Sequence, residues 1–218
     1  GVMRVKKQMI ANNLRNIAIV AHVDHGKTTL VSELLWQSGT HNGADSTHLL
    51  DNNAIEKERG ITILAKNTAL IWKNTKINVV DTPGHADFSG EVERILSMVD
   101  SVLILVDAVE GPMPQTRFVT EMALSNGLAP IVVINKCDRA ASRPYWVLDK
   151  TFDLFEQLGA DDSQLDFPTV YCSAIEGYAR GDPSDADKNM NYLLDTIVEK
   201  VSPPMLQEGP FQMQISAL

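Results

Sequence analysis

Cysteine is scarce in this sequence, which has only Cys137 and Cys172 among 218 residues. Two cysteines cannot build the disulfide framework of a small secreted domain, and both lie at the ends of apolar runs, a context typical of reduced thiols. Long apolar stretches are also lacking, since no run approaches the roughly 18 residues that a membrane span requires. The opening segment has no apolar core or cleavage pattern of a secretory signal, and we interpret Gly1 before Met3 as a cloning remnant. These absences predict a cytoplasmic chain without a membrane partner.

Positive charge is in the minority, because 19 lysine and arginine residues stand against 28 aspartate and glutamate residues, for a formal net charge of −9. A free-standing nucleic-acid-binding domain normally carries a basic face. We therefore expect no DNA partner, and we expect any RNA contact to be local or supplied by other domains. The hydrophobic share of 44% and the charged share of 22% are typical of a globular chain, sized for one α/β domain and a fragment of another.

Apolar runs of strand length alternate with segments of helical period, and this pattern predicts a mostly parallel sheet of about six strands with helices on both faces. The expected strands are 16–21, 68–72, 76–80, 101–107, 130–135 and 169–172. Three sets of residues share a helical face: Phe88, Val92, Ile95, Leu96 and Val99; Leu148, Phe152 and Phe155; and Leu194, Ile197, Val198 and Val201. Residues 39–67 show little periodicity and are predicted to form a functional switch loop, while 179–189 are predicted to form a mobile surface loop.

The segment after the first expected strand reads Ala21-His-Val-Asp-His-Gly-Lys-Thr28, which matches the phosphate-binding pattern G-x-x-x-x-G-K-[ST] except that Ala21 replaces the first glycine. Consecutive backbone N–H groups and a helix N-terminus form an anion cradle, Lys27 can reach the β- and γ-phosphates, and the Thr28 hydroxyl can ligate Mg²⁺. A reading of His22 and His25 as metal ligands explains less, because the cradle accounts for the whole segment. The expected nucleotide-binding residues here are Asp24, His25, Gly26, Lys27, Thr28 and Thr29.

A second motif, Asp81-Thr-Pro-Gly-His85, follows the strand expected at 76–80. Its aspartate therefore lies at the carboxyl edge of the sheet, where it can hold Mg²⁺ through water. Gly84 can offer a backbone N–H to the γ-phosphate, and the following helix gives the loop a rigid end from which to sense that phosphate.

A third motif, Asn135-Lys136-Cys137-Asp138, ends another strand and indicates guanine specificity. Guanine presents two adjacent donors, N1–H and the exocyclic amine, and the Asp138 carboxylate can accept both, whereas adenine has an acceptor at N1. Ser173 and Ala174, after the last strand, are expected to close the base pocket with a backbone N–H directed at the guanine oxygen.

Each motif alone also has an ordinary structural reading, with Asp81 as a helix cap, Asn135 and Asp138 as turn residues and His85 as a polar loop residue. Their order, each at the carboxyl end of a strand, is not explained that way. The combination predicts an α/β P-loop NTPase specific for guanine nucleotides.

With these motifs the sequence resembles the translational GTPases, the elongation-factor family, across nearly its whole length. The family's switch signature is present as Asp51-Asn-Asn-Ala-Ile-Glu-Lys-Glu-Arg-Gly-Ile-Thr-Ile63. The resemblance implies that Thr62 ligates Mg²⁺ and contacts the γ-phosphate, and that Asp51 belongs to the outer shell of the metal. It further implies roles for four other residues: His85 orients the attacking water, Val23 and Ile61 form a hydrophobic gate in front of it, and Asp24 helps to bind a monovalent cation.

Within this family, two segments are most similar to the BipA (TypA) GTPases: Glu110-Gly-Pro-Met-Pro-Gln-Thr-Arg-Phe-Val119, and Asp138-Arg139 followed by Arg143-Pro-Tyr-Trp146. A LepA-like or other elongation-factor GTPase is the alternative, as is a nucleotide-gated ribosome-binding module with little hydrolysis. The resemblance implies a ribosome partner that activates His85, in ribosome assembly or stress adaptation. It leaves open whether His85 acts as a general base or only positions water.

The expected domain organisation follows from the same pattern. Residues 1–13 form an N-terminal extension, 14–201 the GTP-binding domain, and 202–210 a linker that is rich in proline. Residues 211–218 alternate apolar and polar side chains, which predicts a strand, and the resemblance implies that this strand opens a β-barrel domain. The isolated domain is expected to be a monomer.

Overall fold

The computed structural model describes residues 12–40, 67–83 and 89–205. The elements are, in chain order, β1 (Leu14–Ala21), α2 (Lys27–Gln37), β2 (Asn67–Trp72), β3 (Thr75–Asp81), α4 (Ser89–Leu96), β4 (Ser101–Asp107), η3 (Pro114–Thr116), α5 (Arg117–Ser125), β5 (Ala129–Asn135), α6 (Pro144–Gln157), α7 (Asp162–Leu165), β6 (Thr169–Ser173), β7 (Tyr178–Arg180) and α8 (Asn191–Lys200). Most of the predicted switch loop, most of the N-terminal extension and residues 206–218 lie outside the described residues.

The described strands form one sheet in the order β2-β3-β1-β4-β5-β6-β7. Neighbours from β3 to β6 are parallel, whereas the two edge strands, β2 and β7, run antiparallel to theirs. The prediction of a mostly parallel sheet is therefore confirmed, although the sheet has seven strands rather than about six. The extra strand is β7, and it takes up the first two residues of the predicted surface loop 179–189.

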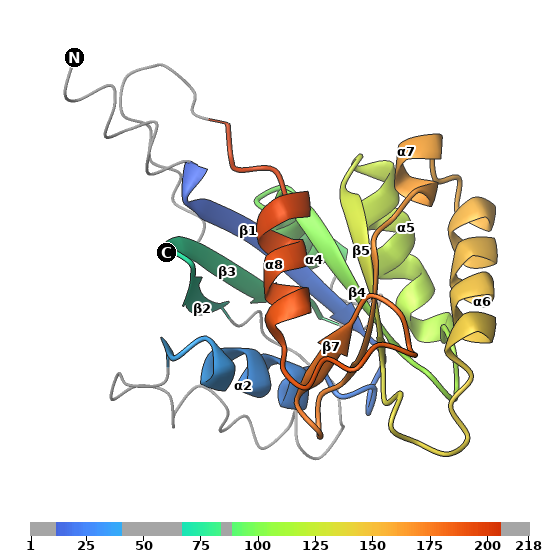
Figure 1. The fold of residues 1–218 in the computed structure, drawn as a ribbon. Coiled ribbons are helices and arrows are strands. Elements are labelled where there is room, and N and C mark those ends of the chain that lie inside the picture. The colour runs from blue at the N-terminus through green and yellow to red at the C-terminus, as the bar shows by residue number, and fades with distance from the viewer. Residues whose placement is uncertain (1–11, 41–66, 84–88, 206–218) are drawn as a thin grey trace, which may run out of the picture.

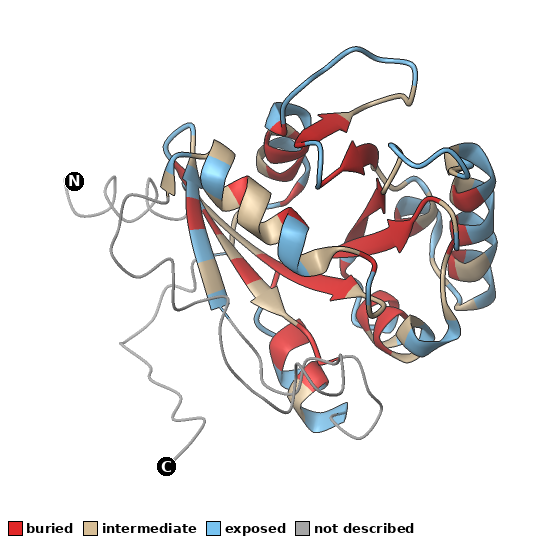
Figure 2. Ribbon diagram, turned by 90° about the horizontal axis from the view of Figure 1, so that it is seen from below, coloured by how far each residue is buried: buried red, intermediate tan, exposed pale blue. Residues whose placement is uncertain are grey.

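Helices cover both faces of the sheet, as predicted (Figure 1). Alternate residues along the strands point to opposite faces and divide the core into two clusters. One cluster packs α2 and α8 against side chains such as Ile17, Leu103 and Val133. The other packs α4, α5 and α6 against Ala18, Ile104 and Val132. β4 is accordingly buried along its whole length and β5 everywhere except its first residue, Ala129 (Figure 2).

The predicted helical faces are largely those that the structure buries. Val92, Ile95 and Leu96 of α4 and Leu194 and Ile197 of α8 are all buried. The face predicted on α6 is partly wrong: Phe155 is buried, but Phe152 has 40% of its surface exposed. Val147 and Thr151, which precede Phe155 at helical spacing, are the other buried residues of α6. Within the described ranges, no helix has the length and apolarity needed to cross a bilayer.

The order of the strands determines where a ligand can bind. The chain runs from β1 to β3 on one side and then returns to β4 on the other side of β1, so the topology reverses at β1. In open α/β sheets, ligands bind beyond the carboxyl ends of the strands at such a switch point. The loops after β1, β3, β4, β5 and β6 all start from that edge, and four of them contain the motifs identified in the sequence.

Candidate nucleotide-binding site

The loop between β1 and α2 has the backbone of an anion cradle. Asp24 and Gly26 adopt positive φ angles of 63° and 93°, and α2 begins immediately afterwards at Lys27. Gly26 is the N-cap residue and makes no side-chain cap, so the first N–H groups of α2 remain directed out of the helix. Thr28 and Thr29 are exposed at this end. The arrangement can bind a phosphate group through backbone N–H groups and the helix dipole.

Gly26 lies in close contact with the loop after β5. A Cβ atom added to Gly26 would lie 2.4 Å from Asn135 Nδ2, which is closer than any real Cβ contact. The positive φ angle of Gly26 also disfavours any side chain. Both the backbone conformation and the close approach therefore require glycine.

The Gly26→Ala substitution is expected to lower the affinity for GDP and GTP by at least about tenfold, since it costs about 1–2 kcal/mol in the left-handed region and also displaces Asn135. Gly127→Ala is the matched control, because Gly127 has a φ angle of 74° but nothing within 4 Å of the position that a Cβ atom would occupy. Equilibrium titration with a fluorescent nucleotide measures both variants. Equal affinities for the two would contradict the importance of the contact with Asn135.

Asn135, which is only 2% exposed, connects three loops of the site. Its Nδ2 donates to the backbone oxygen of His25 at 2.9 Å, and its Oδ1 accepts from the backbone N–H of Ala174 at 3.0 Å. The side chain thus fastens the phosphate loop to the loop after β6. The Ala174 N–H, one of the backbone donors expected near the guanine oxygen, is directed at Asn135 in this structure.

Lys136, with a φ angle of 68°, makes a second connection to the phosphate loop. Its Nζ donates to the backbone oxygen of Asp24 and lies 2.8 Å from Asp107 Oδ2 at the end of β4. Burial alone raises the pKa of Asp107, but the bond from Lys136 and the backbone N–H groups of Val109 and Glu110 outweigh it and leave that pKa below its usual value. The Asp107 carboxylate is therefore ionised and pairs with the Lys136 ammonium.

His25 contributes to the phosphate loop from inside the protein, since its side chain is buried and only 1% of the residue is exposed. Its Nε2 lies 3.0 Å from Glu110 Oε2. Burial is the largest influence on the pKa of His25 and lowers it, although the bond with Glu110 acts in the opposite direction. The imidazole is accordingly neutral at pH 7, and its Nε2–H donates to the Glu110 carboxylate.

Possible ligand atoms of His25, Asp107 and Glu110 lie within 4.8 Å of one another. This cluster does not require a metal ion, because the Lys136 ammonium already supplies the positive charge beside Asp107.

Lys27 and Asp81 meet at the other end of the cradle. Lys27 Nζ lies 2.6 Å from Asp81 Oδ1, and both side chains are partly accessible to solvent. The predicted phosphate-binding ammonium and the predicted metal-binding carboxylate are thus adjacent, as required if a Mg²⁺ ion bridges phosphate oxygens. Thr28, with its hydroxyl at the exposed first turn of α2, adds a further oxygen suited to Mg²⁺.

Asp138 is exposed at the rim of the site, whereas Asn135 and Lys136 of the same motif are turned inward to other loops. Cys137 lies between Lys136 and Asp138 in the sequence. Burial raises the pKa of its thiol to about 11, so the thiol remains protonated. Ser173 is fully buried, and its hydroxyl accepts a bond from the backbone N–H of Glu176. Asp138 is therefore the side chain of the motif that remains available to a nucleotide base.

Several predicted site residues lie outside the described part of the chain: Asp51, Ile61, Thr62, Gly84 and His85. Val23, the other half of the predicted gate, is described and partly buried. The roles assigned to these residues remain predictions.

Sequence reasoning did not identify Asp107 and Glu110 as parts of the site. Asp107 could have been recognised in the sequence, because it is a charged residue at the end of a strand that is otherwise almost entirely apolar. That strand ends at the same sheet edge as the motifs. Glu110 carried none, since its contact with His25 joins residues 85 positions apart in the sequence.

Comparisons with known proteins agree with this geometry. Residues 12–203 match the family model of the elongation factor Tu GTP-binding domain. The large ribosomal subunit assembly factor BipA of Haemophilus influenzae is 60% identical over 98% of this chain and 35% of its own length. BipA of Escherichia coli K12 is 62% identical over 94% of this chain and 34% of its own length. The chain thus spans about a third of these curated relatives.

A crystal structure of a protein from Thermus thermophilus shares the fold, with a TM-score of 0.56, 29% identity, and coverage of 68% of this chain and 22% of that one. Together, the strand-end loops, the guanine motif and the match over 12–203 establish that this chain belongs to the elongation factor Tu GTP-binding domain family.

Proposed function

We propose that this chain binds GTP and GDP and hydrolyses GTP as a molecular switch of the translation-factor type. The observation that supports this most is the arrangement of Asn135, which fastens the phosphate loop and the loop after β6 in one place while Asp138 faces outward. In such a site, the loops joined by Asn135 provide a rigid cradle for phosphates, and Asp138 provides a carboxylate for guanine. An adenine nucleotide would leave the Asp138 carboxylate without donors.

The residues around Lys27 fit a Mg²⁺ ion, because the Asp81 carboxylate and the Thr28 hydroxyl are hard oxygen ligands beside the phosphate cradle. Thr62 and, in the outer shell, Asp51 would complete the set. The ion would neutralise charge on the β- and γ-phosphate oxygens. Lys27 binds the same phosphates, and the backbone N–H groups of residues 24–29 orient them. A monovalent cation beside Asp24 is a further part of this proposal.

His85 would orient the water that attacks the γ-phosphate, with Val23 and Ile61 separating it from the nucleotide until activation. Gly84 would sense the γ-phosphate through its backbone N–H. The relatives are named for large ribosomal subunit assembly, so we take the ribosome to be the activating partner and the cytoplasm to be the location. A role in ribosome assembly follows from the similarity to BipA, and stress adaptation is the related role that the resemblance also implies.

The test is nucleotide binding and phosphate release by the purified chain. GTP and GDP should bind at least about 100-fold more tightly than ATP, because ATP leaves a polar pocket unpaired. Hydrolysis by the chain alone should be slow, since the sequence offers no evident arginine finger, and ribosomes should accelerate it in the natural protein. Tight binding of ATP would contradict guanine specificity. GTP binding with no hydrolysis in the presence of ribosomes would favour the alternative of a nucleotide-gated binding module.

A further inference from the structure

The contact between Glu110 and His25 is not explained by any of the motifs. It joins a side chain on the turn after β4 to the phosphate loop, and among the described residues the Glu110 carboxylate is the only hydrogen-bond partner of the His25 imidazole. We infer that Glu110 is a positioning residue, which holds the phosphate loop through His25 and thereby sets how long a nucleotide stays bound. This inference rests on the proposed nucleotide-binding function.

The Glu110 turn is itself rigid. Asp107 Oδ1 accepts from the backbone N–H groups of Val109 at 2.7 Å and Glu110 at 3.2 Å, and the Gly111 N–H donates to the Asp107 backbone oxygen at 2.9 Å. Gly111 has a φ angle of 77° and packs against the Trp146 ring, which lies 3.1 Å from the position that a Cβ atom would take. These contacts fix the backbone that carries the Glu110 side chain, so the carboxylate is positioned to contact His25.

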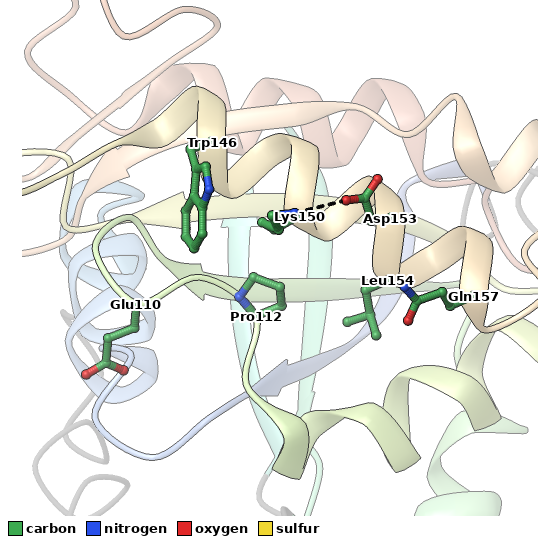
Figure 3. Close-up of a pocket in the computed structure, with 7 residues that line it drawn as sticks. All are labelled: Glu110, Pro112, Trp146, Lys150, Asp153, Leu154 and Gln157. Carbon is green, nitrogen blue, oxygen red and sulfur yellow. Dashed lines mark hydrogen bonds and ion pairs between the residues drawn. The ribbon is translucent and has the colours of Figure 1, made fainter.

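Helix α6 supports the same turn from the other side. The Arg143 backbone N–H donates to the Ala108 backbone oxygen at 2.9 Å. The Arg143 guanidinium donates to the Val109 backbone oxygen and stacks over the Trp146 ring, 3.5 Å from its centroid. In Figure 3 the Glu110 carboxylate points away from Trp146 and Pro112. The side chain therefore extends from a supported turn towards the phosphate loop.

The phosphate loop is thereby held at three places along its backbone and side chains. Lys136 binds the Asp24 backbone oxygen, Asn135 binds the His25 backbone oxygen, and Glu110 binds the His25 side chain. Lys136 also pairs with Asp107, at the base of the Glu110 turn, so the contacts form a closed ring. The first two fix peptide oxygens, and of these three contacts only that of Glu110 fixes the orientation of a side chain within the loop.

Loss of this contact would free a loop that must keep two residues at positive φ angles, Asp24 and Gly26. A cradle of backbone N–H groups binds phosphate tightly only while those groups remain aligned. The β-phosphate is common to GDP and GTP. We therefore expect a freed loop to release both nucleotides faster by the same factor, with no change in base preference.

The experiment compares Glu110→Ala and Glu110→Gln in the 218-residue chain, with Glu121→Ala on the exposed face of α5 as the matched control. Dissociation of fluorescent GDP and GTP analogues is followed by stopped flow. Glu110→Ala should raise both dissociation rates about tenfold, the scale of one hydrogen bond to a charged group. Glu110→Gln should remain within about twofold of the unmodified chain, because its amide oxygen still accepts from Nε2–H.

Two further readouts separate positioning from general stability. The Glu110 side chain is 53% exposed, so Glu110→Ala should still fold, with its thermal midpoint lowered by only a few degrees. The His25 Nε2–H resonance in NMR spectra should persist in Glu110→Gln and be lost or shifted in Glu110→Ala. Unchanged dissociation rates in Glu110→Ala, or rates in Glu110→Gln as fast as those of Glu110→Ala, would overturn the inference. Failure of the unmodified chain to bind GDP or GTP would instead refute the proposed function, and the inference with it.

Discussion

Asp138→Asn should lower the affinity for GTP by at least about 2 kcal/mol, or roughly 30-fold, and raise the affinity for XTP. The asparagine side chain places an amide NH2 group, which is a hydrogen-bond donor, where one carboxylate oxygen was. This NH2 group faces the exocyclic amine of guanine, which is also a donor, but it can donate to the carbonyl that xanthine carries at that position. Asp138 is exposed at the rim, so its replacement should not disturb the fold. Titration of the variant with GTP and XTP measures the change.

Asp149→Asn is a suitable control, because Asp149 is exposed on α6 and the same chemical change there leaves the base pocket untouched. The other two polar residues of the motif are poor substitutes for Asp138 in this test. Asn135 and Lys136 bind the phosphate loop, and changing either would alter the cradle along with the base pocket. GTP binding that is unaffected by Asp138→Asn would remove Asp138 from the base pocket.

The sequence predicts the fold well wherever burial is repetitive. β4 is buried along its whole length, and its short continuous apolar run is typical of a strand covered on both faces. β7 gives no such signal, because it has three residues and pairs antiparallel to β6 only after a tight turn. The face predicted on α6 is partly wrong for a related reason. Thr151 is buried while Phe152 is partly exposed, and apolarity alone cannot reveal that choice.

In the candidate site, the sequence likewise predicts some features and not others. Motif positions at strand ends could be predicted, because parallel strands end at one edge of the sheet. The bonds between them could not. Asn135 binds the backbone of a residue 110 positions away, and Lys136 joins Asp107 to Asp24. These pairs depend on the register of β4 and β5, in which Asp107 lies opposite Asn135. A sequence pattern specifies the residue types but not that register.

The pairing of Lys27 with Asp81 illustrates a second limit of sequence patterns. The sequence assigns the ammonium to phosphate and the carboxylate to Mg²⁺, and the structure places the two 2.6 Å apart. This ion pair is largely buried, with 20% and 18% of the two side-chain surfaces exposed. Its significance is geometric, because the residues predicted to bind phosphate and metal share one corner of the site.

His85→Ala is expected to reduce ribosome-stimulated hydrolysis of GTP by at least about 100-fold, the range for loss of a positioned acid or base. GDP and GTP affinities should remain nearly unchanged, because the groups proposed to bind the nucleotide, Lys27 and the backbone N–H groups of the phosphate loop, do not depend on His85. His85 lies outside the described residues, so this role rests on its place in the motif after β3 and on the family resemblance. Phosphate release by the natural protein, with and without ribosomes, measures the effect.

His85→Gln separates the two ways in which the histidine could act. A glutamine side chain can orient a water molecule by hydrogen bonding but cannot accept its proton at neutral pH. Stimulated hydrolysis that largely survives in His85→Gln and is lost in His85→Ala would identify positioning as the role, whereas equal loss in both would favour a general base. Full stimulated activity in His85→Ala would exclude the residue from the reaction. The attacking water would then have to be oriented by another group near the γ-phosphate, with Thr62 as the next residue to test.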